Sequence, residues 1–408
     1  MSRHIPLIAL STASVISIGG TRLSTIAIPW LVLTTTGSPV LTGLVGFAEM
    51  LPYVLAKALG GPLIDRLSAR RICIWSDALS TMAVVLVPVL FWLGLLSLWT
   101  LLPAVALIGV LRAPSDAAKQ ALVPDIARIG AVSLERVTGV MGASDRLAGT
   151  LGAASAGALI ALLGPAPALL ANAAAFGLSG LVVALGVPRH LATAPKPDVA
   201  TSYRAEFVDG WRVLSQDPVL RSLVIMIAIT NLFDQAYAMV MLPVWVQSAG
   251  LDVSWVGILL ATFSAGAIAG AGIAAAIGER LPRLLLYTLG FICAGPLAFT
   301  VFALNLPLPA ILSALVIGGL SAGFINPILG AILFERIPGP MVGRVTALVG
   351  AVAWALMPFG GLYAGLLIDQ WGIAAALGVS ASLYLLAALS PLIVPSFRQM
   401  QRRPLPQA

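Results

Sequence analysis

The sequence predicts an all-α polytopic membrane protein with about twelve transmembrane helices, arranged as two pseudo-symmetric six-helix halves. Three observations support this fold class. Of the 408 residues, 59% are hydrophobic and only 10% are charged, a balance that a water-soluble core could not accommodate. Lys and Arg residues occupy every second connection between the apolar segments and are absent from the alternate ones. The two parts of the chain also repeat each other at a fixed spacing.

The apolar segments are long enough to cross a bilayer, which takes about 20 helical residues per crossing. The predicted spans are 7–33, 39–62, 72–94, 99–120, 137–162, 167–187, 219–246, 254–277, 284–304, 309–334, 345–368 and 373–395. The first apolar run, from Ile5 to Leu33, is too long for a cleaved signal peptide, so we expect it to be retained as the first helix.

The basic residues predict the orientation, because Lys and Arg resist translocation across the membrane. The basic stretches contain Arg3; Arg66, Arg70 and Arg71; Lys119 and Arg128; Arg189, Lys196, Arg204 and Arg212; Arg280 and Arg283; Arg336 and Arg344; and Arg398, Arg402 and Arg403. The alternate stretches, which hold no Lys or Arg, are 34–40, 94–100, 164–168, 247–254, 304–310 and 369–372. Both termini are therefore predicted to face the cytoplasm, with the protein in the inner membrane.

Composition also argues against several classes of function. The net charge of +7 is spread over the cytoplasmic connections, where anionic lipid head groups explain it, so no nucleic-acid partner is predicted. The two cysteines, Cys73 and Cys293, have neither metal-ligand spacing nor a disulfide framework. The chain lacks a Gly-rich phosphate loop of the Walker type. We therefore expect no enzymatic activity, catalytic residue, cofactor or metal site.

The two halves align with a constant shift of 214 residues over nearly a hundred positions. Pro29 falls on Pro243, and Gly109 falls on Gly323. After a change in loop length the shift becomes 208 residues. This predicts an N-terminal half over 1–187 and a C-terminal half over 219–408 with a short cytoplasmic tail. Such a duplication places a binding site between the halves and favours rocking of one half against the other.

Between the halves lies a predicted cytoplasmic linker over 188–218. Within it, Phe207, Trp211 and Leu214 recur at helical spacing, opposite Arg204 and Arg212. This pattern suits a short amphipathic helix at the membrane surface. A plain solvated linker helix is the alternative.

A resemblance to a known family rests on the connection between the second and third spans. Residues 60–71 read GGPLIDRLSARR, which resembles the signature loop of the major facilitator superfamily, and a weaker copy, GERLPR, occupies 278–283. The stretches around Arg22, 36–39, 51–52, 112–124 and 206–218 are similar to the macrolide-efflux and enterobactin-exporter branch. The resemblance implies the major facilitator fold.

The signature loop also suggests a conformational latch. The resemblance implies that Asp65 latches the two halves in the outward-open state, against the start of span eleven near Arg344. Small residues allow close helix approach there, and a carboxylate can accept hydrogen bonds from a helix N-terminus. The predicted latch residues are Gly60, Gly61, Asp65, Arg66, Arg70, Arg71, Glu279 and Arg280. An ordinary positively charged loop is the alternative.

Charges at membrane depth are the candidate functional residues. Each costs about 2.5–3.5 kcal/mol if unpaired at the bilayer centre, so each should face a cavity or a partner. They are Arg22, Glu49, Lys57, Arg112, Asp145, Arg146 and Asp234. Six of the seven lie in the first half, an asymmetry that a symmetric fold does not require. Lys57 lies near the cytoplasmic end of its span, where its ammonium can reach water, so its role is predicted to be structural.

Proton coupling needs a carboxylate that gains and loses a proton as its surroundings change. We predict Asp145 for this role, paired with Arg112 across spans four and five, while Asp116 competes for the same arginine. By resemblance, Arg112 occupies the place of a span-four arginine associated with proton transfer. Glu49 and Asp234 are the alternative carriers. Predicted cavity aromatics are Trp30, Phe233, Tyr237 and Trp354, although packing is the commoner role of such residues.

Together these features predict a secondary transporter that exports a small amphipathic compound in exchange for protons. Its partners would be that substrate, protons and the lipid bilayer, and the protein would be a monomer. One alternative is a proton symporter that imports a polar nutrient. Another is a membrane sensor or assembly factor that transports nothing.

Overall fold

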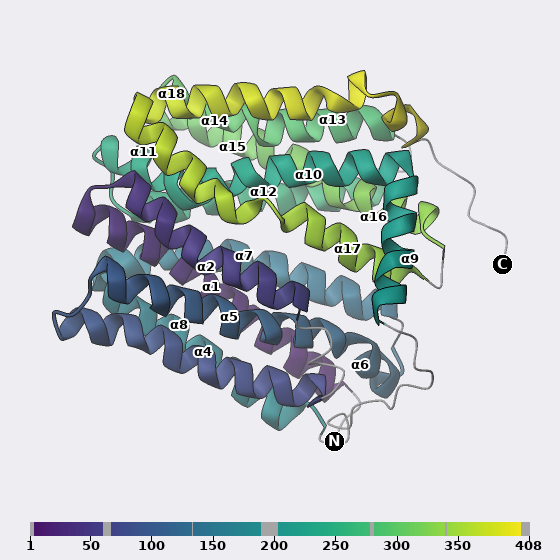
Figure 1. The fold of residues 1–408 in the computed structure, drawn as a ribbon, viewed down its shortest axis with the longest axis horizontal. Helices are drawn as coiled ribbons and strands as arrows, with labels where there is room; N and C mark the ends of the chain where they lie inside the picture. Colours follow the sequence, from purple (N-terminus) through teal and green to yellow (C-terminus); the bar gives the residue numbers. More distant parts are fainter. Residues whose placement is uncertain are drawn as a thin grey trace. The chain divides into compact units, whose positions relative to one another are not determined.

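The computed structural model describes residues 4–59, 67–132, 134–188, 203–277, 281–338 and 341–400, and their regular secondary structure is helical (Figure 1). Among these residues, eleven helical segments are long and apolar enough to cross a membrane. The last of them, Arg344–Ile393, has 50 residues, far more than the about 20 that one crossing requires. The protein is therefore a multi-pass membrane protein, as predicted.

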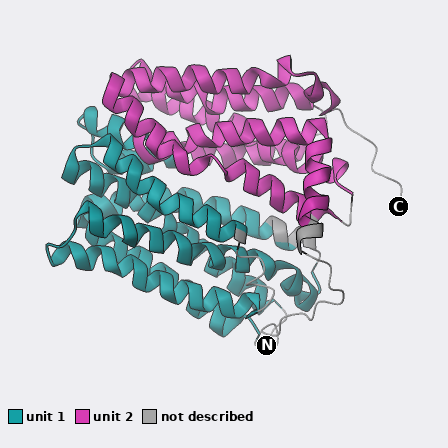
Figure 2. Cartoon of the chain, in the orientation of Figure 1, with its two compact units in different colours: residues 1–196, 242–261 teal, residues 197–241, 262–408 magenta. Residues whose placement is uncertain are grey.

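The chain forms two compact units (Figure 2). Unit 1 comprises Met1–Lys196 and Leu242–Ala261. Its helices are α1 (Ile5–Thr36), α2 (Pro39–Leu59), α4 (Ala69–Trp92), α5 (Leu98–Ala121), α6 (Val123–Gly130), α7 (Leu134–Leu163), α8 (Pro165–Gly186), α11 (Leu242–Ser248) and the first part of α12 (Ser254–Ile277). 

Unit 2 comprises Pro197–Met241 and Thr262–Ala408. It contains the end of α12, together with α9 (Tyr203–Gln216), α10 (Pro218–Ala236), the π-helix η2 (Tyr237–Met241), α13 (Arg283–Ala294), α14 (Pro296–Ala303), α15 (Leu308–Ala322), α16 (Ile325–Arg336), α17 (Val342–Trp354), α18 (Met357–Ile393) and the 3-10 helix η5 (Pro395–Met400).

Gly372 divides α18 into two spans. Its φ of 77° and ψ of 167° are not helical, and glycine adopts a positive φ without the steric cost that other residues meet. The part of α18 before Gly372, together with α17 (Val342–Trp354), corresponds to the predicted span 345–368, and the part after it corresponds to 373–395. With this division, the eleven apolar segments agree with a fold of about twelve helices.

Proline residues and side-chain caps fix where many of the helices begin. Pro165 and Pro218 stand in the first turns of α8 and α10, where a missing N–H costs nothing. Asp217 caps α10 by accepting hydrogen bonds from the backbone N–H groups of residues 219 and 220, at 2.8 and 3.0 Å. Before α12, hydrogen bonds from the side chain and backbone of Ser254 lower the pKa of Asp252.

Four predicted spans are interrupted in ways that hydropathy does not reveal. The eleventh, 345–368, is split into α17 and α18 at Ala355 and Leu356. The ninth predicted span is split into α13 and α14 at Gly295, directly before Pro296, which lacks the N–H that would continue the helix. The tenth is split into α15 and α16 at Gly323 and Phe324. The seventh contains the π-helix η2.

The linker helix α9 runs across the ends of the longer helices of unit 2 rather than along them (Figure 1). Leu214 is buried, and a Cβ atom on Gly210 would lie 2.9 Å from the side chain of Leu348, so one face of α9 packs closely on α17. Phe207 and Trp211 remain exposed. The linker therefore contains a helix, with Phe207 and Trp211 exposed and Leu214 buried, and its place at the membrane surface stays a prediction.

Glycines allow the closest helix crossings in unit 1. A Cβ atom on Gly109 of α5 would lie 2.2 Å from the carbonyl oxygen of Glu49 on α2. A Cβ atom on Gly257 of α12 would lie 2.4 Å from the carbonyl oxygen of Ala153 on α7. The second crossing explains why Leu242–Ala261, predicted as part of the second half, belongs to unit 1. The division into 1–187, 188–218 and 219–408 stays a prediction.

Candidate functional site

Arg112 of α5 is the centre of a buried group of polar side chains in unit 1. Its Nη1 atom lies 3.3 Å from Oε1 of Glu49 on α2, and its Nε atom lies 3.7 Å from Oδ2 of Asp116. The hydroxyl of Tyr53 donates a hydrogen bond of 2.9 Å to Asp116, and the guanidinium carbon lies 4.2 Å from the centre of the Tyr53 ring. We call Glu49, Tyr53, Arg112 and Asp116 the Arg112 cluster.

Helical spacing and one glycine assemble the Arg112 cluster. Glu49 and Tyr53 are four residues apart on α2, and Arg112 and Asp116 are four residues apart on α5, so each pair shares one helix face. Gly109, one turn before Arg112, lets the backbone of α5 touch the backbone of α2 at Glu49. The ion pair therefore forms directly beside the closest crossing of the two helices.

In the Arg112 cluster, one guanidinium lies within ion-pairing distance of two carboxylates. Glu49 and Arg112 are 6% and 7% exposed, so their charges interact with little screening by water. A proton on either carboxylate would weaken its bond to Arg112 and favour the bond to the other. The cluster can thus translate the gain or loss of a proton into a change of helix contact.

The predicted pair between Arg112 and Asp145 is not formed in this structure. Gly109 brings α5 onto α2, whereas α7, which carries Asp145, packs on α1 and α8. Asp116, the competing partner, does contact Arg112. Asp145 is half-buried, and its Oδ1 atom is buried without a hydrogen-bond partner among the described residues. It is a carboxylate with unused hydrogen-bonding capacity.

The other predicted charges occupy different surroundings. Arg22 of α1 is exposed, and Arg146 of α7 is half-buried. Lys57 Nζ lies 3.5 Å from the hydroxyl of Tyr53, in the last turn of α2. Asp234, in unit 2, is exposed and interacts with the hydroxyl of Tyr384. Asp234 also lies in the last turn of α10, three residues before the first residue of the π-helix η2, a kind of distortion that is frequent at functional sites.

Two of the predicted cavity aromatics belong to a packed aromatic cluster in unit 2. The ring of Phe233 lies 5.5 Å from that of Tyr363 and 5.9 Å from that of Tyr384. The ring of Tyr237 lies 5.3 Å from that of Phe299, and its hydroxyl has no hydrogen-bond partner among the described residues. Trp30 and Trp354 are half-buried. Contact of these four residues with substrate stays a prediction.

Unit 1 contains a second buried network of polar side chains, which was not predicted from the sequence. Asp77 of α4 is fully buried and accepts hydrogen bonds from the hydroxyls of Ser115 on α5, at 2.5 Å, and Ser179 on α8, at 2.7 Å. Lys119 Nζ lies 3.4 Å from Oδ2 of Asp77. Lys119 was predicted on the cytoplasmic side, which stays a prediction; the structure places it in the last turn of α5, where its ammonium is buried beside the carboxylate of Asp77. The i, i+4 spacing of Ser115 and Lys119 was the available signal.

The repeat shows that this Asp77–Lys119 network is not needed to build such a six-helix half. With the shift of 214 residues, Asp77 corresponds to Phe291 and Lys119 to Leu333. Phe291 packs edge-on against Tyr287, with ring centres 5.0 Å apart. One half therefore uses apolar packing where the other uses a buried ion pair.

Most of the predicted latch residues, namely Gly60, Gly61, Asp65, Arg66, Glu279 and Arg280, lie outside the described residues. Arg70 is buried, and its Nε and Nη2 atoms donate hydrogen bonds to the carbonyl oxygens of Val187, at 2.8 Å, and Ala184, at 2.6 Å. Arg70 thereby satisfies carbonyl groups at the C-terminal end of α8. Arg71 is exposed. The latch itself stays a prediction.

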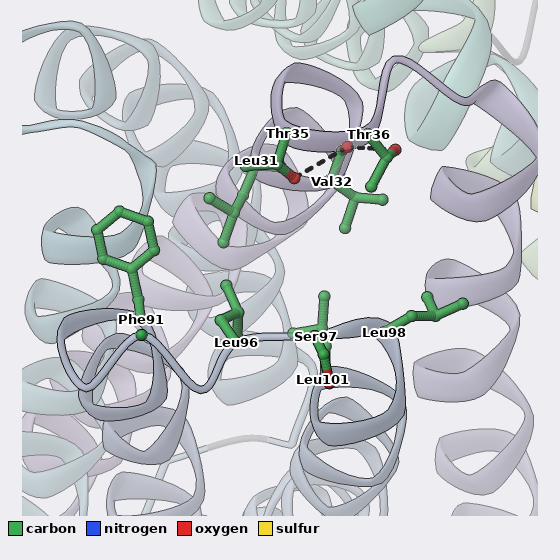
Figure 3. Close-up of a pocket in the computed structure, with 10 residues that line it drawn as sticks. Leu31, Val32, Thr35, Thr36, Phe91, Leu96, Ser97, Leu98 and Leu101 are labelled. Atoms are coloured by element: carbon green, nitrogen blue, oxygen red, sulfur yellow. Dashed lines mark hydrogen bonds between the residues drawn. The ribbon is translucent and has the colours of Figure 1, made fainter.

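A pocket of about 370 Å³ lies where the end of α1 faces the connection between α4 and α5 (Figure 3). The hydroxyls of Thr35 and Thr36 in its lining donate to the carbonyl oxygens of Leu31 and Val32, so they offer little to a polar ligand. The lining is Leu31, Val32, Thr35, Thr36, Phe91, Gly94, Leu96, Ser97, Leu98 and Leu101, without a charged side chain. The pocket is distinct from the Arg112 cluster. Among the described residues, no group of three or more His, Cys, Asp or Glu could hold a metal ion.

The sequence matches the profile of the Major Facilitator Superfamily over residues 10–308 and 224–407. The chain belongs to this superfamily of membrane transporters. It is 30% identical over 413 residues to the multidrug efflux pump Tap of Mycobacterium tuberculosis, covering 99% of this chain and 96% of Tap. It is also 30% identical over 404 residues to the Tap protein of Mycolicibacterium fortuitum, covering 97% of each. The predicted family is confirmed.

Solved transporters share the fold at low sequence identity. A mutant of the nucleoside transporter NupG superposes with a TM-score of 0.77 at 13% identity, covering 97% of this chain and 100% of that one. A bacterial homologue of the human lysosomal transporter Spinster gives 0.69 at 15% identity, covering 99% of each. These likenesses confirm the predicted all-α major facilitator fold.

Proposed function

We propose that this superfamily member exports small amphipathic compounds, drugs among them, in exchange for protons by alternating access. The full-length similarity to the Tap efflux pumps supports the export of drugs. The observation that carries the proton coupling is the Arg112 cluster, in which one buried guanidinium lies between two carboxylates. 

Glu49 is the proton carrier that the geometry favours. When Glu49 is ionised, Arg112 ties α2 to α5 through the pair at 3.3 Å. When Glu49 takes up a proton, Arg112 keeps Asp116 on its own helix, and the tie between the two helices weakens. Asp145, with its unused oxygen, and Asp234 would carry further protons. Among the remaining charged and aromatic residues, the proposed substrate contacts are Arg22, Arg146, Trp30, Phe233, Tyr237 and Trp354.

The test uses purified protein in liposomes, with a pH gradient driving a fluorescent drug. Glu49→Gln should abolish gradient-driven transport and preserve drug exchange without a gradient, because exchange needs binding and rocking but no net movement of protons. Asp252→Asn, which removes an exposed carboxylate outside the spans, is the matched control and should transport normally. Full gradient-driven transport by Glu49→Gln would contradict the role of Glu49, and movement of drug with the protons would contradict export.

The proposal also covers the membrane location, orientation and oligomeric state of the transporter. The positively charged connections support an inner-membrane location with both termini in the cytoplasm, and we propose that the chain works as a monomer. The signature loop supports a latch through Asp65. Asp65→Asn should then reduce transport while expression and drug binding persist, and unchanged transport would contradict the latch.

A further inference from the structure

Arg22 lies too deep in its helix for its charge to reach water at the membrane surface. It is near the middle of α1, which has 32 residues, and at 1.5 Å per residue it is more than about 20 Å from either end. A long side chain can carry its charge to the interface only from near a helix end. Yet Arg22 is exposed, while the next two residues, Leu23 and Ser24, are buried. 

Unlike Arg112, Arg22 forms no ion pair with a carboxylate among the described residues. No described Asp or Glu lies within 4.0 Å of its guanidinium, and Arg112 pairs with the carboxylates of Glu49 and Asp116. The charged side chain that acts on Arg22 is Arg112 itself, which repels it. An exposed cation facing hydrocarbon would be costly, so Arg22 must face water or a ligand that carries negative charge.

The position of Arg22 is fixed by glycines on the neighbouring helix. A Cβ atom on Gly152 of α7 would lie 2.9 Å from the Cα atom of Gly19, so α1 and α7 cross in close contact. One turn away, a Cβ atom on Gly149 would lie 3.6 Å from both Nε and Nη2 of Arg22. The guanidinium therefore rests on a bare stretch of α7 backbone, which holds it in place without neutralising it.

The fold itself does not require a cation at this position. With the shift of 214 residues, Arg22 corresponds to Ala236, which is fully buried. A small apolar residue thus serves the packing of the equivalent helix in unit 2. Arg22 is exposed, has no ion-pair partner among the described residues and is held against α7, which is the arrangement expected of a ligand-binding side chain rather than a structural one.

We infer that Arg22 binds an anionic group of the transported compound, a carboxylate or a comparable oxyanion. This inference rests on the proposed export function and narrows it to compounds that carry an acidic group beside an apolar body. A guanidinium suits this role because its N–H groups match the two oxygens of a carboxylate, and such charge-assisted hydrogen bonds are stronger than neutral ones.

The test compares two dyes that differ in one anionic group. A rhodamine with a free benzoic acid group and its methyl ester share the same apolar body. Binding of each to the purified full-length chain is measured by fluorescence polarisation. The native protein should bind the acid about tenfold more tightly than the ester, and Arg22→Gln should remove this preference by weakening only the binding of the acid. Arg22→Lys, which keeps the charge but loses the two-pronged geometry, should retain part of it.

Arg128→Gln is the control for net charge, because it removes one exposed positive charge from α6 and should keep the full preference for the acid. Binding of both dyes lost together in Arg22→Gln and Arg22→Lys would make Arg22 a structural residue. Three other results would overturn the inference. The native protein could bind acid and ester equally, it could bind neither, or the preference for the acid could persist in Arg22→Gln. 

The same dyes separate this inference from the proposed function. Suppose that Arg22 determines the preference for the acid in the binding measurements, but liposomes with a pH gradient transport neither dye. The anion site would then be supported and proton-driven export would be contradicted. If the liposomes export both dyes at equal rates regardless of Arg22, then export stands and the anion site is wrong. 

Discussion

Replacing Gly109 with alanine should separate α2 from α5 and break the ion pair at the centre of the Arg112 cluster. The added methyl group would lie 2.2 Å from the carbonyl oxygen of Glu49, whereas ordinary contact begins at 3.4 Å. The helices must therefore move apart by about 1 Å to reach ordinary van der Waals contact. The Arg112–Glu49 distance, now 3.3 Å, would then pass beyond the reach of a hydrogen bond.

Opposing effects determine how much folding stability Gly109→Ala is expected to lose. Overpacking in a core costs about 1–3 kcal/mol. Parting a buried ion pair adds to this, because removing one partner outright costs about 3–5 kcal/mol and separation is a milder form of that change. Alanine in place of glycine stabilises a helix by up to about 1 kcal/mol. We therefore expect a net destabilisation of about 2 kcal/mol or more for Gly109→Ala.

The assay combines thermal unfolding in detergent with gradient-driven drug efflux in liposomes. Gly142→Ala on α7 is the matched control, because nothing lies within 4 Å of its added methyl group. This variant should gain the helix stabilisation without any clash, so its Tm should rise slightly and its transport should persist. If Gly109→Ala unfolded at the same temperature as Gly142→Ala and transported as fast, the close crossing would not be what assembles the Arg112 cluster.

Three further outcomes can be measured. Asp145→Asn should abolish pH-gradient-driven efflux yet permit substrate exchange, and full gradient-driven efflux would exclude Asp145 as an essential carrier. In a Cys-free background, a cysteine at Ser38 should react with an impermeant reagent from outside the cell, and one at the partly exposed Ser396 should react only after permeabilisation. The opposite result would reverse the orientation. Asp77→Asn combined with Lys119→Met should unfold at a higher temperature than either single variant, because each single change strands one buried charge, and a lower Tm for the pair would contradict this.

The fold was predictable because it depends on signals that act along the chain. Segment length and hydropathy placed α1, α5 and α8 within a few residues of their observed bounds, and the alternation of basic connections supported the helix count. The breaks at Gly295 and Gly323 were not predictable, because a short interruption barely changes the average hydropathy of a span. 

The site was only partly predictable, because partners at membrane depth are chosen by helix packing. The sequence predicted Arg112 and Glu49 as candidate functional charges but paired Arg112 with Asp145. The observed partner, Glu49, is 63 residues away on α2. Gly109 brings the two helices together, but an uncharged glycine gives no signal of an ion pair in the sequence. The pairing of Lys119 with Asp77 was missed for the same reason, because only the position of α4 reveals that Asp77 reaches it.

Helix α5 connects the two buried networks, and the difference between them indicates which contact can change. Toward α4, Asp77 receives hydrogen bonds from Ser115 and Ser179 as well as the charge of Lys119, and such a well-satisfied carboxylate gains nothing by moving. Toward α2, Arg112 can give up Glu49 and still keep a carboxylate on its own helix. On the proposed mechanism, a proton on Glu49 would therefore loosen α5 from α2 but not from α4. The contact between α2 and α5 is accordingly where we expect protonation to act within unit 1.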